Sequence, residues 1–361
     1  MEQWTIVVLN LKWEPSATSE PSVPSEPFSA HSKNLRTLST LRNSSNLSVG
    51  KHVNGTLKPT TNNHQPTTNT RKEEFYMSTL KEKNQQHIFT ITTELDPPKS
   101  ASSQVTEEQV VKVAPYVDAV NIADCPMAKL RMSPIALSCI IQEKYQVESI
   151  FHLTCRDRNV IGLQAELLGA AALGVHNILT LTGDPPTIGD HPNAKGVFEV
   201  DSTGLIEIAA TLNSGHDLEG HELTVPTNFY IGTTGNPGTD DLDAEIRRLE
   251  GKKKAGAQFV QTQPIYDIKQ AENFLAAAKD LDLPILFGIV PLKSFKMANY
   301  LNDKVPGITI PQKVLAQMET GGRETGLAIS KELVQALRDI HAAGAHLMPV
   351  NDIDAVPYIV G

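Results

Sequence analysis

Four carboxylates stand at the ends of short apolar runs, where a side chain could act as an acid or as a fixed charge: Glu94, Asp124, Asp157 and Asp184. A carboxyl group held between apolar strand ends has its charged form desolvated, so its pKa rises towards the range useful to a general acid. Glu94 is the best candidate, because the run before it is apolar and two prolines stiffen the loop behind it. The residues alone leave an equal alternative, that this carboxylate caps a neighbouring loop.

Two other motifs could carry chemistry. His152 and Cys155 have the spacing of metal ligands, but a strand puts residues three apart on opposite faces, which argues against zinc. The lysines at 252–254 close a predicted helix, where they complement its negative end; the alternative is an anchor for a ligand phosphate. The glycines at 232–238 lack the spacing of a dinucleotide-binding fingerprint, and the sequence has neither a P-loop nor a Gly-x-Ser-x-Gly elbow. These motifs alone do not identify a substrate.

Short apolar runs alternate with amphipathic segments from residue 88 to the end of the chain. The runs predict strands at residues 88–94, 119–122, 149–154, 177–182, 228–232, 258–262, 284–290 and 346–350. The amphipathic segments predict helices at residues 107–113, 134–144, 160–173, 205–213, 242–254, 268–280, 295–302 and 329–343. Eight such alternations over roughly 280 residues match the size of a (β/α)₈ TIM barrel. An open, doubly wound sheet is the alternative that periodicity alone does not exclude.

The positions of polar and Gly/Pro-rich residues favour the barrel. They gather directly after predicted strands, for example at residues 94–98, 155–158, 183–186 and 232–238. In a barrel the C-terminal strand ends meet at one rim, where such enzymes place their chemistry. Gly174 and Gly256 follow two of the predicted helices, and we expect each to act as a C-cap.

Composition argues against several classes of protein. The chain has 361 residues, a formal net charge of -9 and three cysteines that form no CxxC pair. The negative charge argues against a general nucleic-acid binder, and the cysteines argue against a secreted disulfide scaffold. No apolar run reaches the roughly 18 to 20 residues of a membrane span, so we expect a cytoplasmic protein without a membrane anchor.

The N-terminal segment has a composition of its own. Residues 1–77 are rich in Ser, Thr, Asn and Pro and show no sustained period, so we expect a disordered extension before a catalytic barrel domain at residues 78–361. Its basic stretch is similar to an organelle transit peptide, but four glutamates among the first 26 residues argue against that interpretation. Met77 is an alternative start of translation.

Five motifs at predicted strand ends resemble, in their order along the chain, those of the methylenetetrahydrofolate reductase family. They are Thr93-Glu94-Leu95-Asp96-Pro97-Pro98, His152-Leu153-Thr154-Cys155, Leu181-Thr182-Gly183-Asp184-Pro185, Gly256-Ala257 with Thr262-Gln263, and Gly288-Ile289-Val290-Pro291. The resemblance covers about residues 86 to 350. Segments 156–159 and 236–238 are closer to the short bacterial and archaeal type, in which no regulatory domain is expected after the barrel.

The resemblance implies a flavoprotein oxidoreductase that reduces 5,10-methylenetetrahydrofolate to 5-methyltetrahydrofolate. FAD is the implied cofactor, with FMN as an alternative, and NADH or NADPH is the implied co-substrate that reduces the flavin and leaves before the folate enters. A partner flavoprotein or ferredoxin is the alternative donor. A homo-oligomer is the open alternative to a monomer, and no metal is implied.

The resemblance also implies roles for particular residues. Glu94 matches the general acid that helps to open the five-membered ring of the folate to a reactive iminium. Asp184 matches a charge near the flavin and the pterin that favours hydride donation, and Gln263 matches a hydrogen-bond partner of the pterin. The implied contacts of the flavin nucleotide are His152, Asp184, Glu245 and Lys252.

Several positions depart from the family pattern. Leu95-Asp96 stands where the family has two phenylalanines, and Thr182 stands where it has an arginine. Gly235-Asn236 replaces an aromatic residue, and Met297 replaces a glutamine. Without the arginine and the aromatic residue, we expect weaker binding of the adenine half of FAD. The short segment after the eighth predicted strand raises the alternative of an incompletely closed barrel.

Two functions other than the reductase stay open at this point. One is a flavin-independent, pterin-binding methyltransferase barrel, and the other is a noncatalytic subunit of a reductase complex. The presence of Glu94, Asp184 and Gln263 together argues against the noncatalytic subunit, because a chain freed from catalysis need not keep all three.

Overall fold

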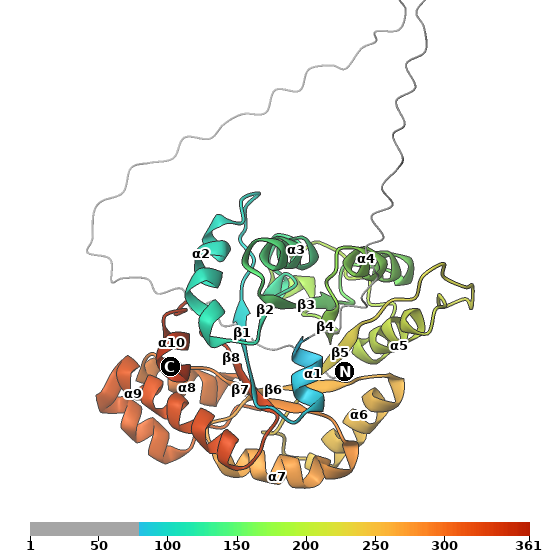
Figure 1. The fold of residues 1–361 in the computed structure, drawn as a ribbon. Helices are drawn as coiled ribbons and strands as arrows, with labels where there is room; N and C mark the ends of the chain where they lie inside the picture. The colour runs from blue at the N-terminus through green and yellow to red at the C-terminus, as the bar shows by residue number, and fades with distance from the viewer. Residues whose placement is uncertain (1–78) are drawn as a thin grey trace, which may run out of the picture. The chain divides into compact units, whose positions relative to one another are not determined.

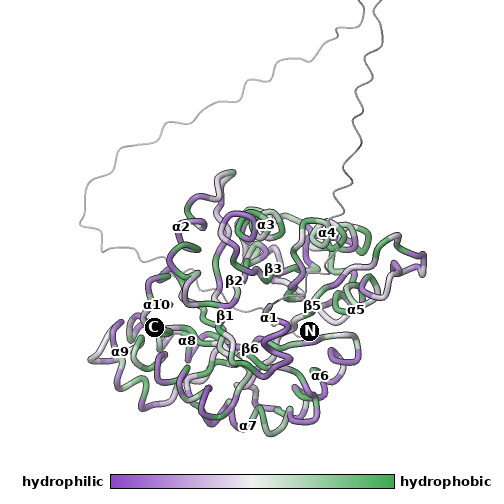
Figure 2. Tube along the Cα trace, viewed as in Figure 1, coloured by the Kyte–Doolittle hydropathy of each residue, from purple (hydrophilic) through white to green (hydrophobic). Residues whose placement is uncertain are grey.

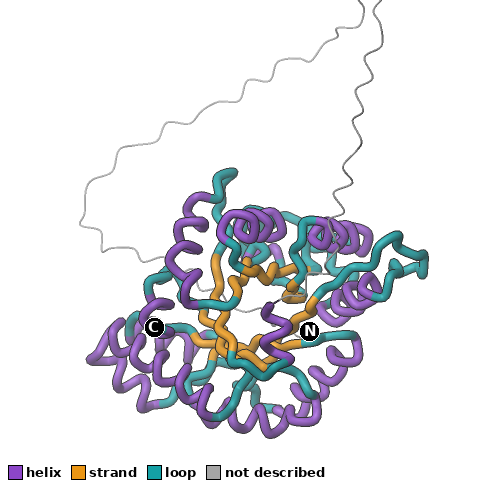
Figure 3. Tube along the Cα trace, viewed as in Figure 1, coloured by secondary structure: helices purple, strands orange, loops and turns teal. Residues whose placement is uncertain are grey.

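The chain folds as a closed barrel of eight parallel strands. The computed structural model describes residues 79–361, so the predicted extension at residues 1–77 lies outside the described residues and its boundary stays a prediction. The strands pair in the order β1-β2-β3-β4-β5-β6-β7-β8, and β8 returns to β1. Figures 1 and 3 show the helices around the ring of strands. The predicted (β/α)₈ TIM barrel is confirmed, and the alternatives of an open sheet and of incomplete closure are wrong for this part of the chain.

The bounds of the elements follow the predicted alternation. The strands are β1 Thr90–Leu95, β2 Ala119–Ile122, β3 Glu148–Thr154, β4 Asn177–Leu181, β5 Tyr230–Gly235, β6 Phe259–Pro264, β7 Ile285–Ile289 and β8 Gly344–Leu347. The helices are α1 Thr79–Gln85, α2 Gln104–Val113, α3 Pro134–Tyr145, α4 Val160–Ala172, α5 Ser202–Asn213, α6 Leu242–Ala255, α7 Ile268–Ala278, α8 Phe295–Lys304, α9 Gln312–Asp339 and α10 Ala355–Val360. Among residues 79–361, no helix is both long and apolar enough to cross a membrane.

The strands are buried on both faces, as expected for a parallel sheet that is covered by helices. Residues that point out of the barrel pack under the helices; Leu95 of β1 and Phe287 of β7, for example, share a cluster with Leu337 of α9. Figure 2 shows hydrophilic stretches along the outer sides of α7 and α9. Each helix thus presents its apolar stripe to the sheet and its polar residues to the outside.

Helix α1 covers the N-terminal mouth of the barrel, across the centre of the ring in Figure 3. Leu80 is fully buried in one cluster with Tyr230 and Phe259, whose rings stack with centroids 4.6 Å apart. Asn84 donates to the Tyr230 hydroxyl at 3.0 Å and accepts from the hydroxyl of Thr90 at 3.2 Å. This end of the barrel is therefore filled, and the inward polar residues lie above it.

The largest difference from the predicted strands is in β5. The sequence predicts a strand only to residue 232, but residues 232–235 continue it and pair with residues 259–262 of β6. A glycine is needed at 232, because an added Cβ would lie 2.2 Å from Cζ of Phe259. The Gly-Thr-Thr-Gly segment therefore belongs to the strand, although its composition is typical of a loop.

Other differences are smaller. Strand β8 ends at Leu347 rather than at residue 350, because Val350 and Asn351 turn away with positive φ angles of 21° and 55°. Helix α9 begins at Gln312 rather than at residue 329, and a break at Gly322 divides it. The sequence did not predict α1. Both expected helix ends are confirmed. Gly256 is the C-cap of α6, and Gly174, one residue after the cap of α4, has a positive φ of 73°.

Candidate active site

Three adjoining cavities form a row along the C-terminal rim of the barrel. The first, of about 500 Å³, lies between the end of β1 and residues 348–353 after β8. The second, of about 310 Å³, lies over the ends of β1 to β4, and the third, of about 860 Å³, lies between β4, β5 and helices α5 and α6. Glu94 lines the first two cavities and Leu181 lines the last two, so each cavity adjoins the next.

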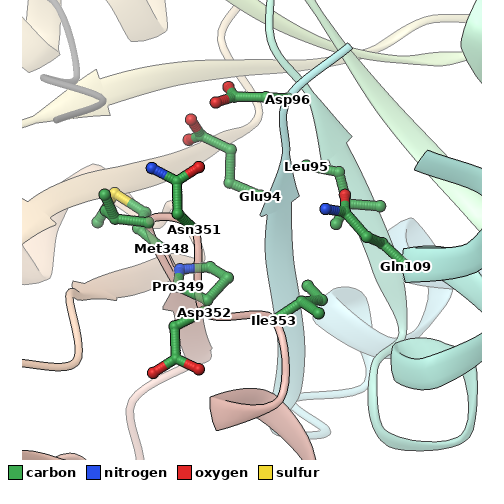
Figure 4. A pocket seen from close by; sticks show the side chains of 10 residues that line it. Glu94, Leu95, Asp96, Gln109, Met348, Pro349, Asn351, Asp352 and Ile353 are labelled. Carbon is green, nitrogen blue, oxygen red and sulfur yellow. The ribbon is translucent and has the colours of Figure 1, made fainter. Parts of the chain in front are cut away.

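Glu94 occupies the junction between the first and second cavities. Its side chain projects from β1 in Figure 4, and the residue is only 7% exposed. Burial raises the pKa of its carboxyl, and the nearby His152 offsets part of that rise. No described residue makes a hydrogen bond with its Oε2, and Nε2 of His346 lies 3.6 Å from this oxygen. Burial therefore favours the neutral acid form of Glu94 over its carboxylate.

A pair of amide side chains fixes the polar residues below Glu94. Asn121 of β2 donates to Gln261 Oε1 at 2.7 Å, and Gln261 of β6 donates back to Asn121 Oδ1 at 3.1 Å. The Asn121 amide nitrogen also lies 3.0 Å from Nε2 of His152, so this ring nitrogen accepts and the proton is on Nδ1. Both amides are fully buried. They form a rigid cross-link through the centre of the barrel.

The same amide pair fixes the tautomer of His346. Gln261 Nε2 donates to the Thr92 hydroxyl at 3.1 Å, so the hydroxyl hydrogen is directed to His346 Nδ1, 2.9 Å away. His346 then carries its proton on Nε2, the nitrogen that faces Glu94. Burial lowers the pKa of His346 to about 3, so the ring is neutral at neutral pH. The series of donors ends in an N–H directed towards the Glu94 carboxyl.

His152 and Asp184 share the second cavity with Glu94. His152 is buried on β3, and desolvation lowers its pKa to about 4 although Glu94 opposes the shift. Asp184 follows β4 and is half-buried. The Cys155 thiol donates to the backbone carbonyl of Asp201, whereas His152 lines the second cavity. The two side chains therefore point in different directions, as predicted. A ligand here would meet a carboxylic acid, a neutral imidazole and a second carboxylate.

The other two strand-end carboxylates hold loops in place. Asp124 accepts from the backbone N–H and the hydroxyl of Thr154, both at 2.9 Å, and from Arg158 at 2.9 Å. Asp157 accepts from Arg156 at 2.7 Å. Both carboxylates are therefore paired with cations and are better explained as structural groups than as acids.

The third cavity has the charge and the backbone geometry to hold a phosphate. Lys252 of α6 lines it although only 2% exposed, together with Arg248 one turn earlier. Ser202 and Thr203 at the N-terminus of α5 form another wall, and Thr182 accepts from the Ser202 backbone N–H at 3.1 Å. Asp201, which also lines this cavity, caps the first N–H groups of α5, so the buried Lys252 is the main group that favours an anion here. The residues here fit the phosphate of a flavin nucleotide.

Glu245 lies on the same helix as Lys252 but faces other partners. Its carboxylate accepts from Nε of Arg248 at 2.7 Å and from the backbone N–H of Asn236 at 2.7 Å. Among the described residues that line the third cavity, α6 contributes Arg248 and Lys252. Glu245 is not among these residues, so its predicted contact with a flavin stays a prediction. In the structure its carboxylate orients Arg248 and the segment after β5.

Gln263 and Met297 lie apart from the row of cavities. Gln263 is buried near the end of β6 and is not among the described residues that line the three cavities, so its pterin contact stays a prediction. Met297 is 2% exposed and packs on α8 in an apolar cluster with Leu292 and Met318. Burial in this cluster is enough to explain why residue 297 is apolar, and no ligand contact is needed to account for it.

The sequence did not single out Arg248, Gln261 or His346. Arg248 stands four residues before Lys252, and this helical spacing could have indicated a shared face. Gln261 and His346 each lie in an apolar run, where a polar residue indicates an inward position. Their meeting across the barrel depends on the register of separate strands, which one sequence does not show.

Comparisons with known proteins agree with this fold. The sequence model of the methylenetetrahydrofolate reductase family matches residues 79–361. The chain is 28% identical over 236 residues to "Methylenetetrahydrofolate reductase 1" of Schizosaccharomyces pombe, a match that covers 61% of this chain and 36% of that protein. It is 23% identical over 218 residues to "5,10-methylenetetrahydrofolate reductase" of Pectobacterium carotovorum, covering 58% and 68%. The matches thus span about a third of the length of the fungal and plant relatives, and the predicted bacterial or archaeal subtype stays a prediction.

A solved structure supports the same fold. It is an uncharacterized protein from Clostridium thermocellum that binds two copies of 5-methyl-5,6,7,8-tetrahydrofolic acid. The two structures align with a TM-score of 0.56 at 17% identity, over 78% of this chain and 97% of the other. At this identity the likeness shows a shared fold.

Proposed function

Because the chain belongs to the methylenetetrahydrofolate reductase family, we propose that it reduces 5,10-methylenetetrahydrofolate to 5-methyltetrahydrofolate with a bound flavin. The observation that carries the proposal is the second cavity, where a buried carboxyl of raised pKa, Glu94, meets Asp184 and the neutral His152. The folate ligand of the Clostridium thermocellum protein, which shares the fold, supports the substrate class.

Glu94 is the proposed general acid. Opening the five-membered ring of the folate requires a proton on the departing nitrogen, and an acid is most effective when its pKa lies near the working pH. Desolvation supplies the raised pKa, while the N–H of His346 faces one carboxyl oxygen and helps to orient the group.

Asp184 is the proposed electrostatic group. It lines the same cavity as Glu94, so its negative charge stands near the place where the iminium cation would form. A fixed negative charge stabilises a developing cation more strongly in a cavity that excludes water. Gln263 is proposed as a pterin contact on the resemblance alone.

The third cavity is the proposed site of the flavin phosphate. Lys252 supplies positive charge, and Arg248, which is paired with Glu245, lines the same cavity. The bound flavin would provide the hydride chemistry, and FAD is proposed with FMN as the alternative. The donor is NADH or NADPH, or alternatively a partner flavoprotein or ferredoxin, and we place the enzyme in the cytoplasm.

Separate measurements of the two half-reactions test this function. In Glu94→Gln we expect normal flavin content and normal reduction by NADH or NADPH, but folate reduction slower by about 10² to 10⁴-fold, the usual contribution of a general acid. Asp184→Asn should slow folate reduction while the protein stays folded. Glu108→Gln removes an exposed carboxylate on α2 and serves as the charge-matched control.

Two outcomes would reject the proposal. Undiminished folate reduction by Glu94→Gln would remove the general acid. A colourless wild-type protein that takes up neither FAD nor FMN would favour the flavin-independent methyltransferase barrel instead.

A further inference from the structure

A second carboxyl group shares the first cavity with Glu94. Asp96 stands two residues after Glu94, just beyond β1, and both line this cavity. Figure 4 shows the two carboxyl groups on the same side of the strand. Leu95, between them, is buried in the cluster under the outer helices. The alternation of the strand therefore brings the two carboxyls to one face.

Asp96 has little to neutralise its charge. Its Oδ1 is buried and makes no hydrogen bond with the residues the structure describes. Burial first, and the nearby Glu94 second, raise the pKa of Asp96 to about 7, although Arg131 opposes the rise. Asp352, across the same cavity, differs because it accepts two hydrogen bonds from Arg323 at 2.6 and 2.8 Å.

Several other ionisable groups lie around Glu94. His152 and His346 are neutral, with pKa values lowered by burial to about 4 and about 3. Asp124 and Arg156 line the second cavity but are paired with Arg158 and Asp157, respectively. Asp184 is the remaining carboxylate of that cavity, and it lies in the loop after β4, whereas Asp96 directly follows the strand of Glu94.

We propose that Asp96 is the charge partner of Glu94: the two carboxyl groups titrate as a coupled pair, in which ionisation of either one disfavours ionisation of the other. Two carboxylates that share a desolvated site do not both ionise readily, because each charge disfavours the other. Asp96 acts through Glu94 and is a positioning residue, not a group that touches the folate. The catalytic part of this inference rests on the proposed function, whereas the coupling between the carboxyls does not.

The pH dependence of folate reduction tests the catalytic part. The step needs protonated Glu94, so its rate falls as the pH rises through the pKa of Glu94. Asp96→Asn removes the neighbouring charge, which lowers that pKa and moves the alkaline limb to lower pH by about one unit. Asp96→Glu keeps the charge and should keep the wild-type limb, and Glu108→Gln is the control for a lost surface charge.

Carbon NMR titration of the side-chain carboxyls tests the coupling without any turnover. In Glu94→Gln we expect the Asp96 pKa to fall towards its usual value, and in Asp96→Asn we expect the Glu94 pKa to fall. An unmoved alkaline limb and independent titrations in an active enzyme would overturn the inference and leave the proposed function intact. Coupled titrations in a protein without folate reduction would instead overturn the proposed function and support the pair.

Discussion

The amide pair at the centre of the barrel gives the sharpest test of the structure. Gln261→Met removes an amide that is fully buried and replaces it with an unbranched apolar side chain of similar length. The change removes three short hydrogen bonds, two with Asn121 at 2.7 and 3.1 Å and one to Thr92 at 3.1 Å, and a longer one to Nδ1 of His346 at 3.4 Å. Asn121 keeps His152 as a partner of its nitrogen, but its oxygen loses its donor.

The cost follows from these contacts. A buried hydrogen bond contributes about 1 kcal/mol net, so the loss of the three short bonds should lower the free energy of unfolding by about 3 kcal/mol. In a domain of this size each kcal/mol lowers the Tm by about 2 °C, which gives a shift of about 6 °C. Gln335→Met is the matched control, because Gln335 is exposed on α9 and donates only to Asp339 among the described residues.

Far-UV circular dichroism during heating and urea unfolding is the suitable assay. Both tryptophans, Trp4 and Trp13, lie outside the described residues, so tryptophan fluorescence is not an assured probe of the barrel. We expect the control to change the stability by less than about 0.5 kcal/mol. A Gln261→Met variant as stable as that control would refute the assignment of the amide pair as a structural cross-link.

Further predictions concern packing and ligand affinity. Gly232→Ala should destabilise the barrel by about 1 to 3 kcal/mol, because the new Cβ meets the Phe259 ring. Its control, Gly169→Ala on the open face of α4, should stabilise the protein by about 0.5 to 1 kcal/mol. Equal effects of the two changes in urea unfolding would contradict the close contact. Lys252→Met should weaken FAD or FMN binding at least about tenfold in a fluorescence titration, because it removes a charge-assisted contact with phosphate. Lys254→Met, which changes an exposed lysine of the same helix, should leave the affinity unchanged. Equal affinities in the two variants would refute the phosphate site.

Much of the fold could be predicted because its signals are local. Each strand is a short apolar run, and the polar residues at its end indicate the rim of a barrel. Residues 79–85 carry a single apolar side chain, Leu80, and therefore show no helical period. Helix α1 is explained by what Leu80 and Asn84 contact in the folded barrel, which no local pattern contains.

The site could be predicted in part, for the same reason. Glu94, His152 and Asp184 follow from strand ends and from a family resemblance, and the structure brings all three to one cavity. Asp96 was visible only as a departure from the family pattern, and its role depends on a burial that the sequence does not show. Arg248 was missed because its partner, the carboxylate of Glu245, fixes which way the guanidinium faces.

Helix α1 has a consequence for how the reactants reach the site. It covers the N-terminal mouth of the barrel, so donor and folate must both approach the row of cavities from the rim. If one flavin serves both reactants, they compete for the same approach and must visit in turn. Under the proposed function, an excess of either reactant should then inhibit turnover by occupying the form of the enzyme that awaits the other.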